Sequence, residues 1–191
     1  MNGYFSQAGV FLISVAFGFY ILIMMLRVLL QAVRADFHNP VSQFVVRLTT
    51  PVLRPARRLI PAVGGLDLAG LLVLLVLQVV ELVLIHGMTG QSLHPAVLLV
   101  IAVGSLLSTA LWIFIVAIIV QVILSWVQPG TYNPVAGLLH QITAPVLRPF
   151  RNVVPVVSGM DLSPLAALVV LNLILMAIPY LQGSLLRSLL A

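Results

Sequence analysis

Apolar residues fall in four long runs along the chain, separated by shorter stretches that carry most of the polar and charged side chains. The runs cover residues 8–33, 68–86, 96–127 and 163–181. About 20 consecutive apolar residues are enough for a helix to cross the hydrocarbon core of a bilayer. The pattern therefore predicts an all-α membrane protein with four transmembrane helices.

The third run is longer than one crossing requires. A single helix over residues 96–127 would be about 48 Å long, while the hydrocarbon core is about 30 Å thick. We therefore expect a tilt or a break, and Gly104 and Ser105 are the expected place for a break. Residues 95–103 would then be an interfacial or re-entrant segment, and the span would cover residues 106–127.

The chain repeats itself with a period of 94 residues. Residues 39–68 align without a gap on residues 133–162, and 15 of these 30 positions are identical. A repeat of this kind indicates a fold built from two copies of one unit. Each copy consists of a span, a polar segment and a span, so both copies start on the same side and are parallel. We assign residues 1–90 to the first repeat, with spans at 8–33 and 68–86 and an interfacial segment at 36–66. Residues 91–191 form the second repeat, with spans at 106–127 and 163–181 and an interfacial segment at 130–161.

Composition and charge agree with a membrane protein. Of the 191 residues, 62% are hydrophobic and 7% are charged, against about 25% charged in an average soluble domain. All nine basic residues are arginine, and the formal net charge is +5. Because the arginines flank apolar segments, anionic lipid headgroups are the expected partner, and nucleic acid is not. The chain has no cysteine, which excludes disulfides and thiolate metal sites within it.

Arginine is unevenly divided between the two sides of the predicted membrane. Arg187 lies on the side of the termini, whereas the polar segments inside the repeats hold Arg34, Arg47, Arg54, Arg57, Arg58, Arg148 and Arg151. The positive-inside rule therefore predicts that the polar segments are cytoplasmic and that both termini are outside.

Each polar segment begins with an Asn-Pro pair. Asn39 and Asn133 suit helix N-caps, with Pro40 and Pro134 in the first helical position. The apolar positions that follow recur at helical spacing, which predicts an amphipathic helix at the membrane interface. Three prolines then follow in each copy, and we expect them to forbid a continuous helix and to form a stiff, bent connection. They are Pro51, Pro55 and Pro61 in the first copy, and Pro145, Pro149 and Pro155 in the second.

Arginines recur within this bend. Arg54 and Arg57, followed by Arg58, correspond to Arg148 and Arg151 in the second copy. A guanidinium group can bind phosphate through two hydrogen bonds. The bend is therefore a candidate site for an anionic lipid or for a carboxylate of a protein partner. The alternative is that these arginines only neutralise nearby aspartates and anchor the interface.

Asp67 and Asp161 each precede a span directly. They suit N-caps of the second and fourth spans, where the helix dipole favours an anion, and Arg54 or Arg57 is an expected partner of Asp67.

Several polar side chains fall inside the predicted spans. Because polar groups in a span face protein or water, we expect two equivalent stripes to face the repeat interface or the bent segment. Gln78 and Asn172 are repeat equivalents deeper in the spans, and interhelical hydrogen bonds of about 1 kcal/mol are their favoured role. The stripes are Arg27, Gln31 and Arg34 in the first copy, and Gln121, Ser125 and Gln128 in the second.

Glu81 lies within the second span, about 20 Å beyond Asp67, and its repeat equivalent is Leu175. An intramembrane carboxylate is a candidate functional group. Two interpretations remain open: an ion or proton role, and a protonated, hydrogen-bonded structural role. Arg27 lies nearer the cytoplasmic end, so a direct pair with Glu81 would require a tilt.

Patterns typical of catalysis and metal binding do not occur. We find no nucleophile motif, no phosphate-binding loop and no zinc-ligand spacing, and the four histidines provide no facing pair for haem. We therefore predict no enzyme, no metal site and no cofactor.

The repeated motif PVLRPxR, with a proline four residues after its last arginine and Gly-x-Asp before the next span, resembles the YggT family of small membrane proteins. The segment SWVQPGTYNP before the second copy is also similar to that family, whereas the first copy lacks its QPG turn. The resemblance implies a two-repeat protein of the bacterial inner membrane. Relatives with one repeat in plastids and cyanobacteria are linked to cytochrome b6 maturation and to nucleoid or division organisation, and no catalytic residue is implied.

Two functional hypotheses follow. The first is a non-enzymatic assembly or scaffold protein whose Arg- and Pro-rich cytoplasmic segments bind anionic lipid or a protein partner, and we expect a membrane-protein partner or a homo-oligomer. The alternative is a small ion channel or transporter component that uses Glu81 together with the other intramembrane polar residues, namely Arg27, Gln78, Gln121 and Asn172.

Overall fold

The computed structural model describes residues 3–60, 67–91, 93–127, 133–155 and 161–190. The helices of this part, in chain order, are α1 (Tyr4–Ala32), α2 (Pro40–Leu59), α3 (Leu68–Met88), α4 (Pro95–Val127), α5 (Pro134–Val153) and α6 (Ser163–Leu190). Four of them, α1, α3, α4 and α6, are long and apolar enough to cross a membrane. The prediction of an all-α membrane protein with four transmembrane helices is confirmed.

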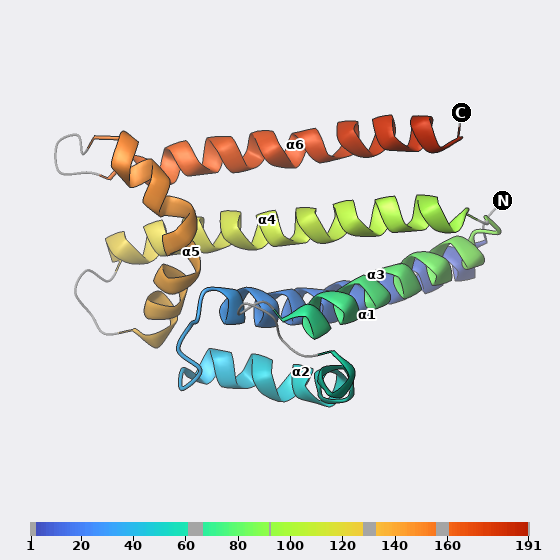
Figure 1. Ribbon diagram of the computed structural model, residues 1–191, viewed down its shortest axis with the longest axis horizontal. Helices are drawn as coiled ribbons and strands as arrows, with labels where there is room; N and C mark the ends of the chain where they lie inside the picture. The colour runs from blue at the N-terminus through green and yellow to red at the C-terminus, as the bar shows by residue number, and fades with distance from the viewer. Residues whose placement is uncertain (1–2, 61–66, 92, 128–132, 156–160, 191) are drawn as a thin grey trace.

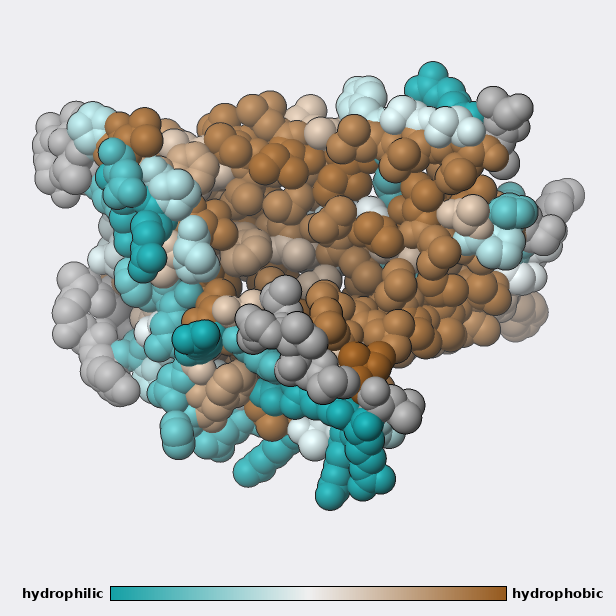
Figure 2. All heavy atoms as spheres, in the orientation of Figure 1, coloured by the Kyte–Doolittle hydropathy of each residue, from teal (hydrophilic) through white to brown (hydrophobic). Residues whose placement is uncertain are grey.

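The four long helices run side by side, with both chain termini at one end of the bundle (Figure 1). We call this the terminal end, and the opposite end, where α2 and α5 lie, the α2/α5 end. In each repeat the two long helices pack against each other, α1 on α3 and α4 on α6, and the short helix packs against both. Figure 2 shows hydrophilic side chains over α2 and α5 and a hydrophobic surface over the long helices.

Helix α4 is continuous over 33 residues. The predicted break at Gly104 and Ser105 is therefore wrong, and residues 95–103 are part of the helix, not a re-entrant segment. Gly104 is buried against the side chain of Gln182 in α6, so this glycine permits close packing. A glycine inside a helix costs only about 1 kcal/mol, which the packing of the helix pair offsets. The extra length of α4 runs beside α6, which is also longer than predicted.

Helices α2 and α5 continue through the prolines in their interiors, which are Pro51 and Pro55 in α2 and Pro145 and Pro149 in α5. The prediction that these prolines forbid a continuous helix is wrong. An internal proline removes one backbone hydrogen bond and bends the helix, and both helices are visibly bent in Figure 1. Their inner faces are held by packing, because Leu53 and Leu147, which lie between the prolines, are each 1% exposed.

The ends of the short helices are set by local hydrogen bonds. The side-chain oxygens of Asn39 and Asn133 each accept a hydrogen bond at 2.9 Å, from the N–H of Val41 and Val135 respectively. These bonds satisfy backbone donors that the first turn leaves free. Helix α5 ends just before Pro155; the corresponding Pro61 lies outside the described residues.

The two repeats meet along α4, which packs against α3 and, more weakly, against α1. A buried cluster that includes Ile23, Val45, Ala117 and Leu138 joins α1 and α2 of the first repeat to α4 and α5 of the second. The short helices also touch directly, because the side-chain amide of Asn39 donates to the carbonyl of Pro134 at 2.6 Å. The α2/α5 end is thus one continuous structure.

Candidate functional site

In the first repeat one arginine ties three helices together at the α2/α5 end. Arg57, in the last turn of α2, donates hydrogen bonds to the carboxylate of Asp67 and, at 2.7 Å, to the side-chain oxygen of Gln31 in α1. The Asp67 side chain is 1% exposed and caps α3 by accepting from the N–H of Gly70 at 3.0 Å. Here α1 and α3 approach so closely that a Cβ on Gly70 would lie 2.8 Å from a methyl carbon of Val28. We call this junction of the three helices the closed corner, because its carboxylate is buried and α1 and α3 are in close contact.

The equivalent corner of the second repeat is open. Arg151 Nε lies 3.2 Å from Asp161 Oδ2, but the two side chains are 38% and 40% exposed. Asp161 accepts a hydrogen bond at 2.9 Å from the N–H of Ser163. Its hydrogen bonds with Ser163, together with Arg151, lower the pKa of the Asp161 carboxyl below its ordinary value. The same ion pair thus forms in both repeats, but only the first is sequestered.

Two residue differences between the repeats accompany this opening. The position of Gln31 is occupied by Ser125, whose hydroxyl donates to the carbonyl of Val122 in its own helix. The position of Gly70 is occupied by Pro164, whose ring is bulkier. The arginine therefore loses a partner, and the close helix approach is not available.

A groove of about 570 Å³ lies at this open corner, between α4 and α6. Arg151 and Asp161 line its polar side. Trp126, at the end of α4, is 76% exposed, and indole rings at this depth are typical of the interface between lipid and water. A charged mouth with apolar walls suits an amphiphilic molecule. The lining residues are Gln121, Ser125, Trp126, Arg151 and Asp161 together with Ile119, Val122, Ile123, Leu162, Pro164, Leu165 and Leu168.

The acidic side chains of the chain are all engaged within it. Asp36 contacts His38, Glu81 accepts from Gln78, and Asp67 and Asp161 pair with arginines. None of these four carboxylates contacts the five other arginines of α2, α5 and the connection between α1 and α2. Each of those five is exposed, and they are Arg34, Arg47, Arg54, Arg58 and Arg148.

One glutamine of each polar stripe contacts the short helix of its repeat, whereas Arg34 and Ser125 are exposed. Gln31 accepts from Arg57, and Gln121 accepts a hydrogen bond from the hydroxyl of Thr143 in α5. The guanidinium carbon of Arg27 lies 4.8 Å from the centre of the Phe37 ring, a cation–π contact. Gln128 of the predicted stripe lies outside the described residues, as do the glycines of the Gly-x-Asp motif.

The deeper polar residues do not form the interhelical hydrogen bonds we expected. Gln78 donates to Glu81 within α3 at 2.8 Å, because residues three apart are neighbours on a helix. Asn172 donates to the carbonyl of Leu168 in its own helix at 2.8 Å and is exposed. The structure therefore brings Gln78 and Glu81 together and keeps Arg27, Gln121 and Asn172 apart from them.

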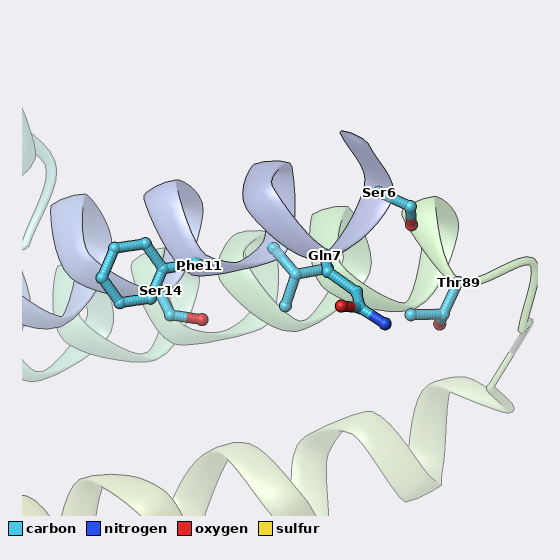
Figure 3. Close-up of a pocket in the computed structure, with 6 residues that line it drawn as sticks. Ser6, Gln7, Phe11, Ser14 and Thr89 are labelled. Carbon is cyan, nitrogen blue, oxygen red and sulfur yellow. The ribbon is translucent and has the colours of Figure 1, made fainter. Parts of the chain in front are cut away.

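A second groove, of about 380 Å³, lies at the terminal end. Ser6, Gln7 and Ser14 reach it from α1, and Thr89 from the end of α3 (Figure 3). The hydroxyl of Ser6 donates to the carbonyl of Met88 at 2.9 Å. Its lining residues carry no charge. In the described part of the chain, no three His, Asp or Glu side chains are grouped so that they could hold a metal ion.

Sequence reasoning missed Trp126 and Pro164 as parts of a site, and it placed Ser125 only on a polar stripe. The signal was present in the alignment of the repeats, in which Gln31 is aligned with Ser125 and Gly70 with Pro164. A search for residues that the copies share passes over these positions, because the groove arises where the copies differ.

Comparison with known proteins identifies relatives along most of the chain. The CCB3/YggT family profile matches residues 6–88 and again residues 100–182. An uncharacterized protein of Pseudomonas aeruginosa is 46% identical over 171 residues, which cover 88% of this chain and 87% of the relative. A Vibrio alginolyticus protein is 41% identical over 158 residues (81% and 84%), and Escherichia coli K12 YggT is 35% identical over 168 residues (88% and 87%). No solved structure matches.

Proposed function

The chain belongs to the CCB3/YggT family, and from that premise we propose that it is a non-enzymatic protein of the bacterial inner membrane that binds anionic phospholipid at its α2/α5 end. In this role it serves as an assembly or scaffold protein. The matches of the family profile are themselves 94 residues apart, which confirms the prediction of two YggT repeats.

The observation that carries the proposal is the uncompensated positive charge of the α2/α5 end. Five exposed arginines there form no ion pair with any of the four acidic side chains, which are bound to other partners. Each arginine near an anionic membrane surface contributes about 1 kcal/mol to the free energy of binding to that surface. Phosphate groups of lipids are the anions nearest to a helix that lies at the membrane boundary, so they supply the missing charge.

The groove at the open corner is the proposed place for one of these lipids. Its apolar walls between α4 and α6 suit an acyl chain, and its mouth offers Arg151 and the Trp126 indole to the headgroup. Arg151 uses only its Nε toward Asp161, so its terminal nitrogens can donate to a phosphate. In the first repeat a terminal nitrogen of Arg57 already binds Asp67 and Gln31.

The orientation in the membrane follows from the same charges. Eight arginines lie at the α2/α5 end, including Arg27 against Phe37, and one, Arg187, lies near the terminal end. The positive-inside rule then assigns the α2/α5 end to the cytoplasm, where the anionic headgroups of the inner leaflet are available.

Fluorescence quenching tests the proposal, because the chain has only two tryptophans. In a Trp112→Phe background, Trp126 becomes the only indole. The protein is placed in phosphatidylcholine vesicles that contain a fixed fraction of brominated phosphatidylglycerol or brominated phosphatidylcholine. We expect about fivefold enrichment of the anionic lipid around Trp126, from one arginine's contribution.

Two variants make the test specific. Arg151→Gln should reduce the enrichment to near unity, whereas Arg187→Gln, near the terminal end, should leave it unchanged. Equal quenching by the two brominated lipids would overturn the proposal. Enrichment that persists in Arg151→Gln and disappears when Arg54, Arg58 and Arg148 are replaced would move the binding site from the groove to the exposed arginines.

A further inference from the structure

The two repeats contact each other through surfaces that are not equivalent. In the first repeat, α3 packs against α4 of the second repeat. The repeat equivalent of this contact would join α6 to a copy of α1. Among the helices that the structure describes, α6 packs on α4 and α5 and makes no comparable contact with α1 of its own chain.

The face of α6 that corresponds to the α4-binding face of α3 is open. Leu74 and Gln78 in α3 are buried, with Gln78 only 7% exposed. Of their equivalents in α6, Leu168 is half-buried and Asn172 is exposed. The same loss of burial is found at the position after Leu74, where Leu75 is half-buried and its equivalent Val169 is exposed.

The face of α1 that corresponds to the docking face of α4 is open as well. Leu106, Ala110 and Ile113 of α4 pack in the buried cluster of the first repeat, and Ile113 is 7% exposed. Their equivalents in α1 are one turn apart on one face: Leu12, Ala16 and Phe19. All three are exposed, with Phe19 at 60%. The chain thus exposes, on α6 and on α1, the two surfaces that correspond to the packed faces of α3 and α4.

We propose that a second copy of this chain docks through the Leu12, Ala16 and Phe19 face of its α1 onto the Leu168, Val169 and Asn172 face of α6. The contact between chains would have the same packing as the contact between α3 and α4 within one chain. It is a head-to-tail contact. Because the repeats are parallel, the axis that relates them lies along the membrane normal, so successive copies stay in the bilayer, and they close into a ring when the rotation between them closes.

Asn172 supports this choice of occupant. Its side chain is exposed within a helix long enough to span the membrane, and polar side chains in such helices are rarely exposed to lipid. A second copy would bury Asn172, as its equivalent Gln78 is buried in the first repeat. This surface shares Leu168 with the groove at the open corner, but the inference does not depend on a lipid bound there.

Site-directed crosslinking tests the contact directly, since the chain contains no cysteine. Leu74 and Ile113 share one buried cluster, so their equivalents Leu168 and Phe19 mark the register between copies. Phe19→Cys and Val169→Cys are made in differently tagged chains, co-expressed and treated in membranes with a short bismaleimide. Both positions are exposed, so the substitutions should leave the fold intact.

The matched control is Val170→Cys, at the same depth on another exposed face of α6. We expect the crosslinked product of positions 19 and 169 at more than five times the yield of positions 19 and 170. Equal yields, or no product from cysteines that a monofunctional maleimide labels, would overturn the proposal. A dominant product between two copies of position 169 would also overturn it, because α6 would then pair with itself.

A second measurement separates weak association from none. Native mass spectrometry of the Phe19→Ala protein, released from nanodiscs, should show the oligomer reduced at least tenfold relative to the unchanged chain. An unchanged distribution, or a monomer in both cases, would contradict the inference.

Discussion

The buried ion pair of the first repeat should contribute far more to stability than its exposed counterpart in the second. Asp67→Ala removes the cap of α3, which costs about 0.5–2 kcal/mol, and leaves Arg57 without its carboxylate. Breaking a fully buried pair costs about 3–5 kcal/mol, but the Arg57 side chain is 37% exposed and can be partly hydrated. We therefore expect a total loss of about 3 kcal/mol.

Asp161→Ala is the matched variant at the equivalent position. Both partners of this pair are about two-fifths exposed, and exposed ion pairs contribute only about 0.2–1 kcal/mol. The bond to Ser163 N–H adds a capping contribution at the lower end of the usual range. The expected loss is about 1 kcal/mol, one third of that for Asp67→Ala.

Thermal unfolding in detergent, followed by circular dichroism, measures the difference. For a chain of this size a loss of 1 kcal/mol lowers the midpoint by about 2–4 °C, so Asp67→Ala should lower it by about 6–12 °C and Asp161→Ala by about 2–4 °C. Asp67→Asn keeps an acceptor for the cap and should lie between them. Equal shifts for the two alanine variants would refute the argument that burial separates the two corners.

Three further predictions concern single positions. Gly70→Ala should lower the free energy of unfolding by about 1–3 kcal/mol, because its Cβ would meet Val28. In the same unfolding assay Gly9→Ala should lower it by less than half as much, because its Cβ would meet only the flexible end of the Met88 side chain. Glu81→Gln should leave proton and potassium flux into liposomes unchanged if Glu81 is structural, and lost flux would support the channel alternative. The lowered pKa of Asp161 predicts that its stabilising contribution is full above about pH 4 and is lost at lower pH, so the midpoint difference between the unchanged chain and Asp161→Asn should vanish there.

The spans, the repeat and the helix caps could be predicted from the sequence because each depends on local chemistry. Long apolar runs have no stable alternative to membrane helices, and Asn39 and Asn133 cap helices with bonds that reach only two residues along the chain. A match of 15 positions in 30 does not arise from composition alone. These features do not require knowledge of which helices touch.

The two wrong predictions about helix continuity came from helix-breaking rules applied without packing. The expected weak point at Gly104 is the position where α4 meets Gln182. Pro51 and Pro55 each remove one hydrogen bond, but Leu53 between them is buried on the inner face. Tertiary contacts of this kind outweigh a local cost of a few kcal/mol, and no single-sequence rule includes them.

Duplication explains why the open surfaces lie where they do. In the first repeat Gln31 and Gly70 close the corner around Asp67, and α4 covers the neighbouring face of α3. Among the described helices none covers the equivalent face of α6, and the corner of the second repeat holds Ser125 and Pro164, which do not close it. The groove and the proposed docking face therefore have one common origin: the second repeat exposes surfaces whose equivalents in the first repeat are buried. A ligand or a second copy must occupy those surfaces if the second repeat is to be as well packed as the first.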